Sequence, residues 1–165
     1  MRRFLAVFCA VAVFSLAGCS GQTIAGFSEN DLLLKIDGSA YRCRDSIETV
    51  VADLGDGYEY AEGKSCNYDG LDKTYTYENA TFYTNPLPEG DLINEIYTES
   101  AAATTSRGIA VGAGKADVLA AYGEPAGQDA AILIYRLSEE IGQPSLCFEL
   151  EGDRVSAIFL TMEQV

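Results

Sequence analysis

The chain has 165 residues and carries 25 Asp and Glu against 11 Lys and Arg, which gives a formal net charge of −14. This length allows one domain or two very small ones and excludes a large multidomain enzyme. Because 48% of the residues are hydrophobic and only 4 are Pro, the composition predicts a folded globular protein. The acidic surface repels phosphates, so nucleic-acid binding is excluded.

The N-terminus has the features of a cleaved export signal. Arg2 and Arg3 precede an uninterrupted apolar run at residues 4–16, and polar residues 20–23 follow too soon for a permanent transmembrane span. Residues 16–19, Leu-Ala-Gly-Cys, are typical of a bacterial lipobox, the site at which a cysteine is acylated and becomes the first residue of the mature chain. The alternative is an ordinary secretory signal with Cys19 as a bystander. We therefore predict removal of residues 1–18 and lipidation of Cys19.

Such processing predicts a lipoprotein on the extracytoplasmic face of the cell membrane. Removal of the signal takes away two arginines and changes the net charge from −14 to −16. Electrostatic attraction to anionic headgroups is then ruled out, so the acyl chains must supply the membrane anchor.

Three cysteines remain for the fold once Cys9 leaves with the signal and Cys19 takes lipid. Disulfides persist outside the cytoplasm, and Cys43 and Cys66 both lie in polar, loop-like contexts, so we predict a disulfide between them. Cys147 lies in an apolar strand pattern and is predicted to be a small buried side chain. The chain contains no His, which excludes a Cys/His nucleophile pair and a Cys₂His₂ zinc site.

Self-comparison indicates an internal repeat. Residues 46–55 match residues 114–123, and each segment is predicted to be a short helix that stops at a glycine, Gly55 or Gly123. Alternating β-prone runs follow each helix, at residues 74–77, 80–83, 92–97, 132–135, 146–150 and 155–160.

The predicted fold class is therefore α+β, with two tandem repeats. Each repeat is expected to be a short helical segment packed on an antiparallel sheet of about three to four strands. The predicted organisation is a signal peptide at 1–18, a lipidated cysteine and flexible tether at 19–33, a Tyr-rich repeat at 34–99 and a second repeat at 104–165.

Two stretches resemble known families. The pattern Ile-x-Val-Gly-x-Gly-Lys-x-Asp-Val-Leu-x-x-Tyr-Gly-x-Pro at residues 109–125, behind a lipobox, resembles the β-lactamase-inhibitor-protein-like superfamily, which includes the SmpA/OmlA outer-membrane lipoproteins. Residues 60–77 resemble a group of uncharacterised lipoproteins of gut Firmicutes. The resemblance implies a fold of two α+β repeats and a non-catalytic binding role, without identifying a partner.

Two other motifs are interpreted as turns. Residues 111–117 lack the glycine and the Ser/Thr that a phosphate-binding loop needs, so they are predicted to lead into a helix. Residues 67–72 carry three oxygen-bearing side chains around Gly70, but the terminal Glu of a calcium loop is missing. We predict no metal and no cofactor.

Tyrosine is concentrated in the first half of the mature chain. The alternation of Tyr75 and Tyr77 places both rings on one face of a strand. If that face is uncovered, these rings form a stacking platform suited to proteins, peptides or sugars; the alternative is that tyrosine simply suits half-buried strands. The predicted partner-binding residues are Tyr58, Tyr60, Tyr68, Tyr75 and Tyr77.

The functional expectation is a non-catalytic module that binds a protein or peptide. No base, nucleophile and oxyanion site occur together in the sequence, so the chain is predicted not to be an enzyme. Two alternatives remain open: a structural or assembly accessory of the cell envelope, and a solute-binding lipoprotein that presents small molecules to a transporter.

Overall fold

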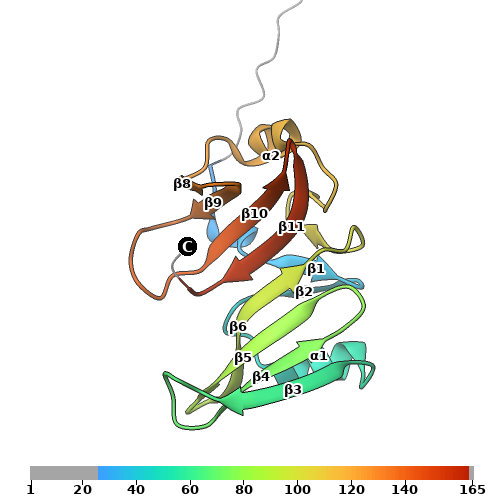
Figure 1. Ribbon diagram of the computed structural model, residues 1–165, viewed down its shortest axis with the longest axis vertical. Coiled ribbons are helices and arrows are strands. Elements are labelled where there is room, and N and C mark those ends of the chain that lie inside the picture. The colour runs from blue at the N-terminus through green and yellow to red at the C-terminus, as the bar shows by residue number, and fades with distance from the viewer. Residues whose placement is uncertain (1–25, 164–165) are drawn as a thin grey trace, which may run out of the picture.

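A computed structural model describes residues 26–163 of the chain (Figure 1). Its helices are η1 (Glu29–Asp31), a single 3-10 turn, α1 (Ile47–Leu54) and α2 (Lys115–Tyr122). Its strands are β1 (Leu34–Ile36), β2 (Ser39–Tyr41), β3 (Glu59–Lys64), β4 (Leu71–Thr76), β5 (Thr81–Leu87), β6 (Gly90–Thr98), β7 (Thr104–Thr105), β8 (Gly127–Asp129), β9 (Ile132–Arg136), β10 (Ser145–Glu151) and β11 (Arg154–Thr161).

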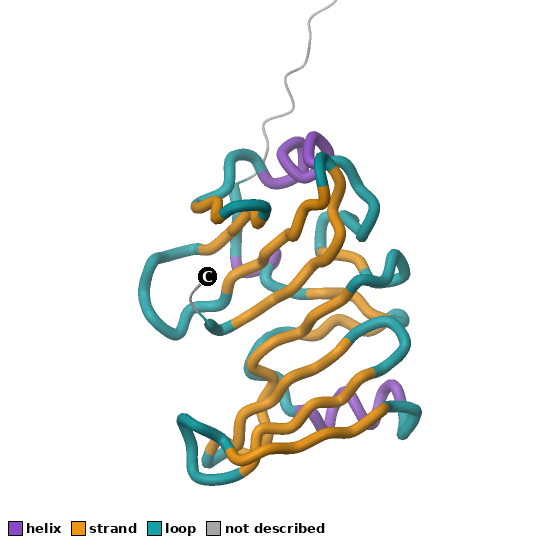
Figure 2. The backbone as a smooth tube through the Cα atoms, viewed as in Figure 1, coloured by secondary structure: helices purple, strands orange, loops and turns teal. Residues whose placement is uncertain are grey.

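Eight of the strands form one antiparallel sheet in the order β3-β4-β5-β6-β11-β10-β9-β8. The pairing of β6 with β11 joins the strands of the two halves of the chain. It aligns Thr98 with Ile158, Tyr97 with Phe159 and Ile96 with Leu160. The sheet therefore continues through this seam, as the unbroken run of strands in Figure 2 shows.

This architecture overturns the predicted fold class. The chain is mostly β-structure, with a large eight-stranded sheet and a separate three-stranded sheet in the order β2-β1-β7, rather than two helix-on-sheet units. Two physical features were missed. The hydrogen bonds between β6 and β11 pair two strands that would otherwise be open edges of the two predicted repeats. The eight-residue helices are too short to cover a sheet of this width.

The two helices nevertheless form where the sequence predicts them. Ser46 caps α1 by accepting a hydrogen bond from the backbone N–H of Glu48, at 3.2 Å. Each helix ends at a glycine with a φ of 78°, Gly55 or Gly123, in the left-handed region that side chains disfavour. The run at 111–117 leads into α2 as predicted, because Gly114 is its N-cap.

The main core lies between one face of the large sheet, the small sheet and the two helices. We call this face of the large sheet the inner face. Val50 of α1, Val118 of α2 and Leu34 of β1 are fully buried in the same cluster as the inner-face residue Phe82. Tyr41 of the small sheet meets Phe82 edge to face at 5.4 Å between ring centroids.

The range predicted as a flexible tether enters this body before β1. Asp31 is 4% exposed, Leu32 belongs to the main core, and Phe27 packs against it with its ring 6.1 Å from that of Tyr122. The signal segment, the lipobox and Cys19 lie outside the described residues.

Candidate functional site

Four of the five predicted binding tyrosines gather on the inner face of the large sheet. The ring of Tyr58 lies 5.0 Å from that of Tyr75 and 5.3 Å from that of Tyr77, and the ring of Tyr60 lies 5.3 Å from that of Tyr75. Tyr68 lies apart, in the loop between β3 and β4. The alternation of Tyr75 and Tyr77 does place both rings on one face, but that face is the covered one.

Tyr75 and Tyr77 are core residues rather than an exposed stacking platform. Each is only 8% exposed. The hydroxyl of Tyr77 donates to the carbonyl of Gly55 at the end of α1, at 3.0 Å, and burial raises the pKa of Tyr77 to about 12. Of the predicted set, Tyr60 and Tyr68 remain open to solvent, at 47% and 39% exposed, while Tyr58 is half-buried.

The predicted disulfide is absent from the structure, where Cys43, Cys66 and Cys147 are all free thiols. The Cys43 Sγ lies 3.3 Å from the backbone carbonyl of Asn94, and burial raises its pKa. Cys66 is exposed in the loop after β3. Cys147 is fully buried, as predicted from its apolar context.

The opposite side of the large sheet, which we call the outer face, carries a second apolar cluster. Cross-strand pairing sets Tyr97, Phe159, Cys147 and Ile134 side by side on consecutive strands. This cluster includes no residue of either helix. Its centre is buried: Phe159 is 7% exposed and Ile134 is 2% exposed.

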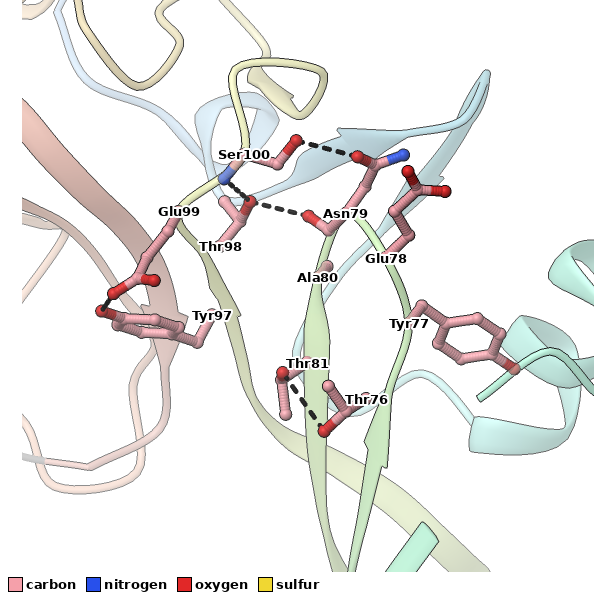
Figure 3. Close-up of a pocket in the computed structure, with 10 residues that line it drawn as sticks. All are labelled: Thr76, Tyr77, Glu78, Asn79, Ala80, Thr81, Tyr97, Thr98, Glu99 and Ser100. Carbon is pink, nitrogen blue, oxygen red and sulfur yellow. Dashed lines mark hydrogen bonds between the residues drawn. The ribbon is translucent and has the colours of Figure 1, made fainter. Parts of the chain in front are cut away.

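The accessible part of the outer face lies toward β4, β5 and β6. Tyr83 is 39% exposed, and Tyr97 is half-buried on the neighbouring strand, two residues along β6 from Glu95, which lies opposite Tyr83. Figure 3 shows the ring of Tyr97 directed to the opposite side of the sheet from that of Tyr77, which points toward α1. Tyr83 and Tyr97 thus present aromatic rings on a face that the helices leave uncovered.

Two shallow hollows flank these rings. The first, of about 330 Å³, lies at the turn between β4 and β5 (Figure 3). Tyr97, Thr76 and Thr81 form one side of it, while Thr98 donates to the carbonyl of Asn79 at 2.7 Å and so holds the turn against the end of β6. The second hollow, of about 270 Å³, is lined by Tyr83 and by polar side chains of β4, β5 and β6.

Carboxylates surround both hollows. Glu99 lines the first and accepts a hydrogen bond from the Tyr97 hydroxyl at 2.9 Å, while burial together with that bond raises the pKa of Tyr97. Asp72 and Glu95 line the second. Burial raises the pKa of Glu95, against a lowering contribution from a hydrogen bond with Thr161.

The basic residue that lines the second hollow does not place its charge on the outer face. Lys73 lies two residues from Tyr75 on β4, so it shares the inner face, and it pairs with Asp91 at 2.5 Å. The outer face around Tyr83 and Tyr97 is therefore both aromatic and acidic, a combination that favours a partner with apolar and cationic side chains.

Tyr83 and Tyr97 are not among the binding residues that the sequence predicts, although tyrosine is concentrated in this half of the chain. The available signal was the alternation in residues 80–83 and 92–97, which sets Tyr83 opposite in face to Phe82, and Tyr97 opposite to Ile96. Which of the two faces the helices cover depends on tertiary packing, and alternation alone does not determine it.

Within residues 26–163, no group of three or more Cys, Asp or Glu side chains is arranged to hold a metal ion, and no helix has the length and apolarity that crossing a bilayer requires. Comparison with models of protein families, with curated proteins and with solved structures finds no match for this chain.

Proposed function

We propose that the chain is a membrane-anchored, extracytoplasmic lipoprotein that binds a protein partner through the outer face of its large sheet. The observation that carries the proposal is the pair Tyr83 and Tyr97, set between two hollows on the face that the helices leave uncovered. Tyrosine supplies large contact area at a low cost in conformational entropy, and it is enriched among the residues that dominate binding energies.

The charge of this face defines the partner further. Glu99 is exposed beside Tyr97, and Asp72 and Glu95 lie near Tyr83. A partner with lysine or arginine around an apolar centre complements this pattern. Association should therefore weaken as ionic strength rises, since exposed charges are screened over about 8 Å at physiological salt.

Crosslinking from intact membranes tests the proposal, with the full chain as bait. Tyr83→Ser removes the central ring, and Leu137→Ser is a matched control because Leu137 is exposed to a similar degree, 43% against 39%, and lines neither hollow. We expect one stoichiometric partner with the native chain and with Leu137→Ser, and its loss with Tyr83→Ser and with Glu99→Lys.

Equal recovery of general envelope proteins by all four baits would overturn the proposal and favour an assembly accessory of the envelope instead. Thermal unfolding of each variant checks that lost binding is not lost folding. Saturable binding of a small solute, with no protein recovered, would favour the solute-binding alternative.

A further inference from the structure

The eight-stranded sheet has two edges, and they differ in length and exposure. At one end β8 spans only Gly127–Asp129. At the other end β3 runs for six residues, Glu59–Lys64, all of them exposed, and among the strands of residues 26–163 it pairs with β4 alone (Figure 1). A six-residue open edge is a template for another strand, because its outer backbone groups have no ladder partner.

The register identifies these outer groups. The backbone N–H of Ser65 donates to the carbonyl of Gly70 at 3.1 Å, so the pair that continues the β3–β4 ladder is a hydrogen-bonded one. Along an antiparallel strand, the backbone N–H and C=O groups of successive residues point alternately toward one neighbouring strand and away from it. The N–H and C=O groups of Tyr60, Glu62 and Lys64 therefore point away from β4, toward the open edge.

Side chains at this edge define what an added strand would meet. Tyr60 begins a cross-strand row on the inner face that continues through Tyr75 and Phe82. Its ring is 47% exposed, and its hydroxyl donates to the carboxylate of Glu62. An apolar side chain opposite Tyr60 would extend the aromatic row, and a cationic side chain opposite Glu62 would pair with its carboxylate.

We propose that the β3 edge binds an extended, basic segment of a partner protein by strand addition. In the antiparallel arrangement, the segment carries Lys or Arg opposite Glu62 and opposite Glu59, and an apolar residue opposite Tyr60. The inference rests on the proposed function, because it supplies the chemistry of the partner. It adds a second contact, at the edge of the sheet rather than on the outer face.

A second copy of the chain fits this edge less well. The three outward-facing residues of one β3 can form hydrogen-bonded pairs only with those of another. The register that pairs all three sets Glu62 directly opposite Glu62, and like charges in direct opposition are destabilising. The edge thus disfavours self-pairing while remaining open to a basic strand.

Synthetic peptides test the proposal on the full chain in detergent. The probe reads threonine–threonine–arginine–threonine–valine–lysine–threonine, in which arginine lies opposite Glu62 and valine opposite Tyr60. N-methylation of the arginine and valine amides removes the N–H groups that face β3. N-methylation of the lysine and of the threonine between arginine and valine alters only amides that face away from β3. Fluorescence anisotropy should show binding of the probe, loss of binding with the first pair of methyl groups, and retention with the second.

Charge reversal provides the second arm. Glu62→Lys should weaken binding of the probe by about tenfold, and a peptide with glutamate in place of arginine should recover it. Glu62→Ala keeps the backbone donor and should show an intermediate loss. Equal binding of the two methylated peptides, or no binding of the probe, would overturn the strand-addition inference.

The proposed function would survive that failure if the native chain still captured a partner that depends on Tyr83. Sedimentation equilibrium supplies a further check, because a dimer of the native chain that Glu62→Lys alters would assign the edge to a second copy and also overturn the inference.

Discussion

The ion pair between Asp31 and Arg107 ties the start of the described chain to α2, and its removal should destabilise the fold strongly. Arg107 donates two hydrogen bonds to the carboxylate of Asp31: Nη2 lies 2.6 Å from Oδ2 and Nε lies 2.8 Å from Oδ1. Ser106 and Ser28 also donate to the carboxylate, at 2.9 to 3.0 Å. The same guanidinium donates to the carbonyl of Ala121 in α2 at 2.7 Å.

The magnitude follows from burial. Asp31 is 4% exposed, so Arg107→Ala would leave a buried carboxylate without its cation and should lower the free energy of unfolding by about 3 to 5 kcal/mol. Burial alone would raise the pKa of Asp31, but the hydrogen bonds from Arg107 and the two serines outweigh it and lower the pKa from 3.8 to about 2. Such a carboxyl adds about 2 kcal/mol to the free energy of unfolding near neutral pH.

The sign of the pH dependence follows from this lowered pKa. The contribution of Asp31 is fully present above the unfolded-state pKa and is lost as the pH falls toward 2. Urea unfolding of the native chain and of Asp31→Asn, measured from pH 6 to pH 2, isolates this group from the other carboxylates. The difference between the two should shrink by about 2 kcal/mol. A constant difference, or a loss below about 1 kcal/mol in Arg107→Ala, would refute the assignment.

Two further predictions concern thiols and tyrosine hydroxyls. In the folded mature chain a thiol reagent should label the exposed Cys66 rapidly and the other two cysteines slowly, because burial raises the pKa of Cys43 and raises that of Cys147 to about 12. In denaturant all three thiols should react. A count of one reactive thiol would instead indicate a disulfide. The Tyr77 and Tyr135 hydroxyls each donate to a carbonyl at a helix end, at 3.0 and 2.9 Å. Replacement of either by Phe should cost about 0.5 to 1.5 kcal/mol in chemical denaturation, and no change in both variants would contradict those bonds.

Local elements were predictable where local chemistry determines them. The two helices and the strands with clean alternation lie where the sequence places them. Strand β3 was missed because Glu59, Glu62 and Gly63 have low β-propensity, and its conformation depends on pairing with β4. The short β1 and β7 were missed for the same reason, since three- and two-residue strands exist only through their partners.

The arrangement of the elements was less predictable than the elements themselves. The local sequence of residues 95–98 does not indicate that they pair with residues 158–161. That pairing depends on which strands are still at an edge after each half of the chain has formed its own antiparallel strands. The same limit affected the candidate site. The alternation of Tyr75 with Tyr77 predicts a shared face, yet only packing against α1 shows that this face belongs to the core.

The proposed anchoring through Cys19 should place the membrane far from the β3 edge, and this can be tested. The carbonyl of Gly26 accepts a hydrogen bond from Arg107 at 2.9 Å, so the described chain begins beside α2, and α2 and β3 lie at opposite ends of the longest axis (Figure 1). Seven residues from Cys19 to Gly26 span at most about 25 Å. In a Cys66→Ser background, a dye on Ala120→Cys in α2 should therefore be quenched by spin-labelled headgroups more strongly than a dye on Ala61→Cys in β3. Equal quenching would contradict anchoring through Cys19, whereas the expected order would leave the β3 edge facing away from the membrane, where an extended segment of a partner can reach it.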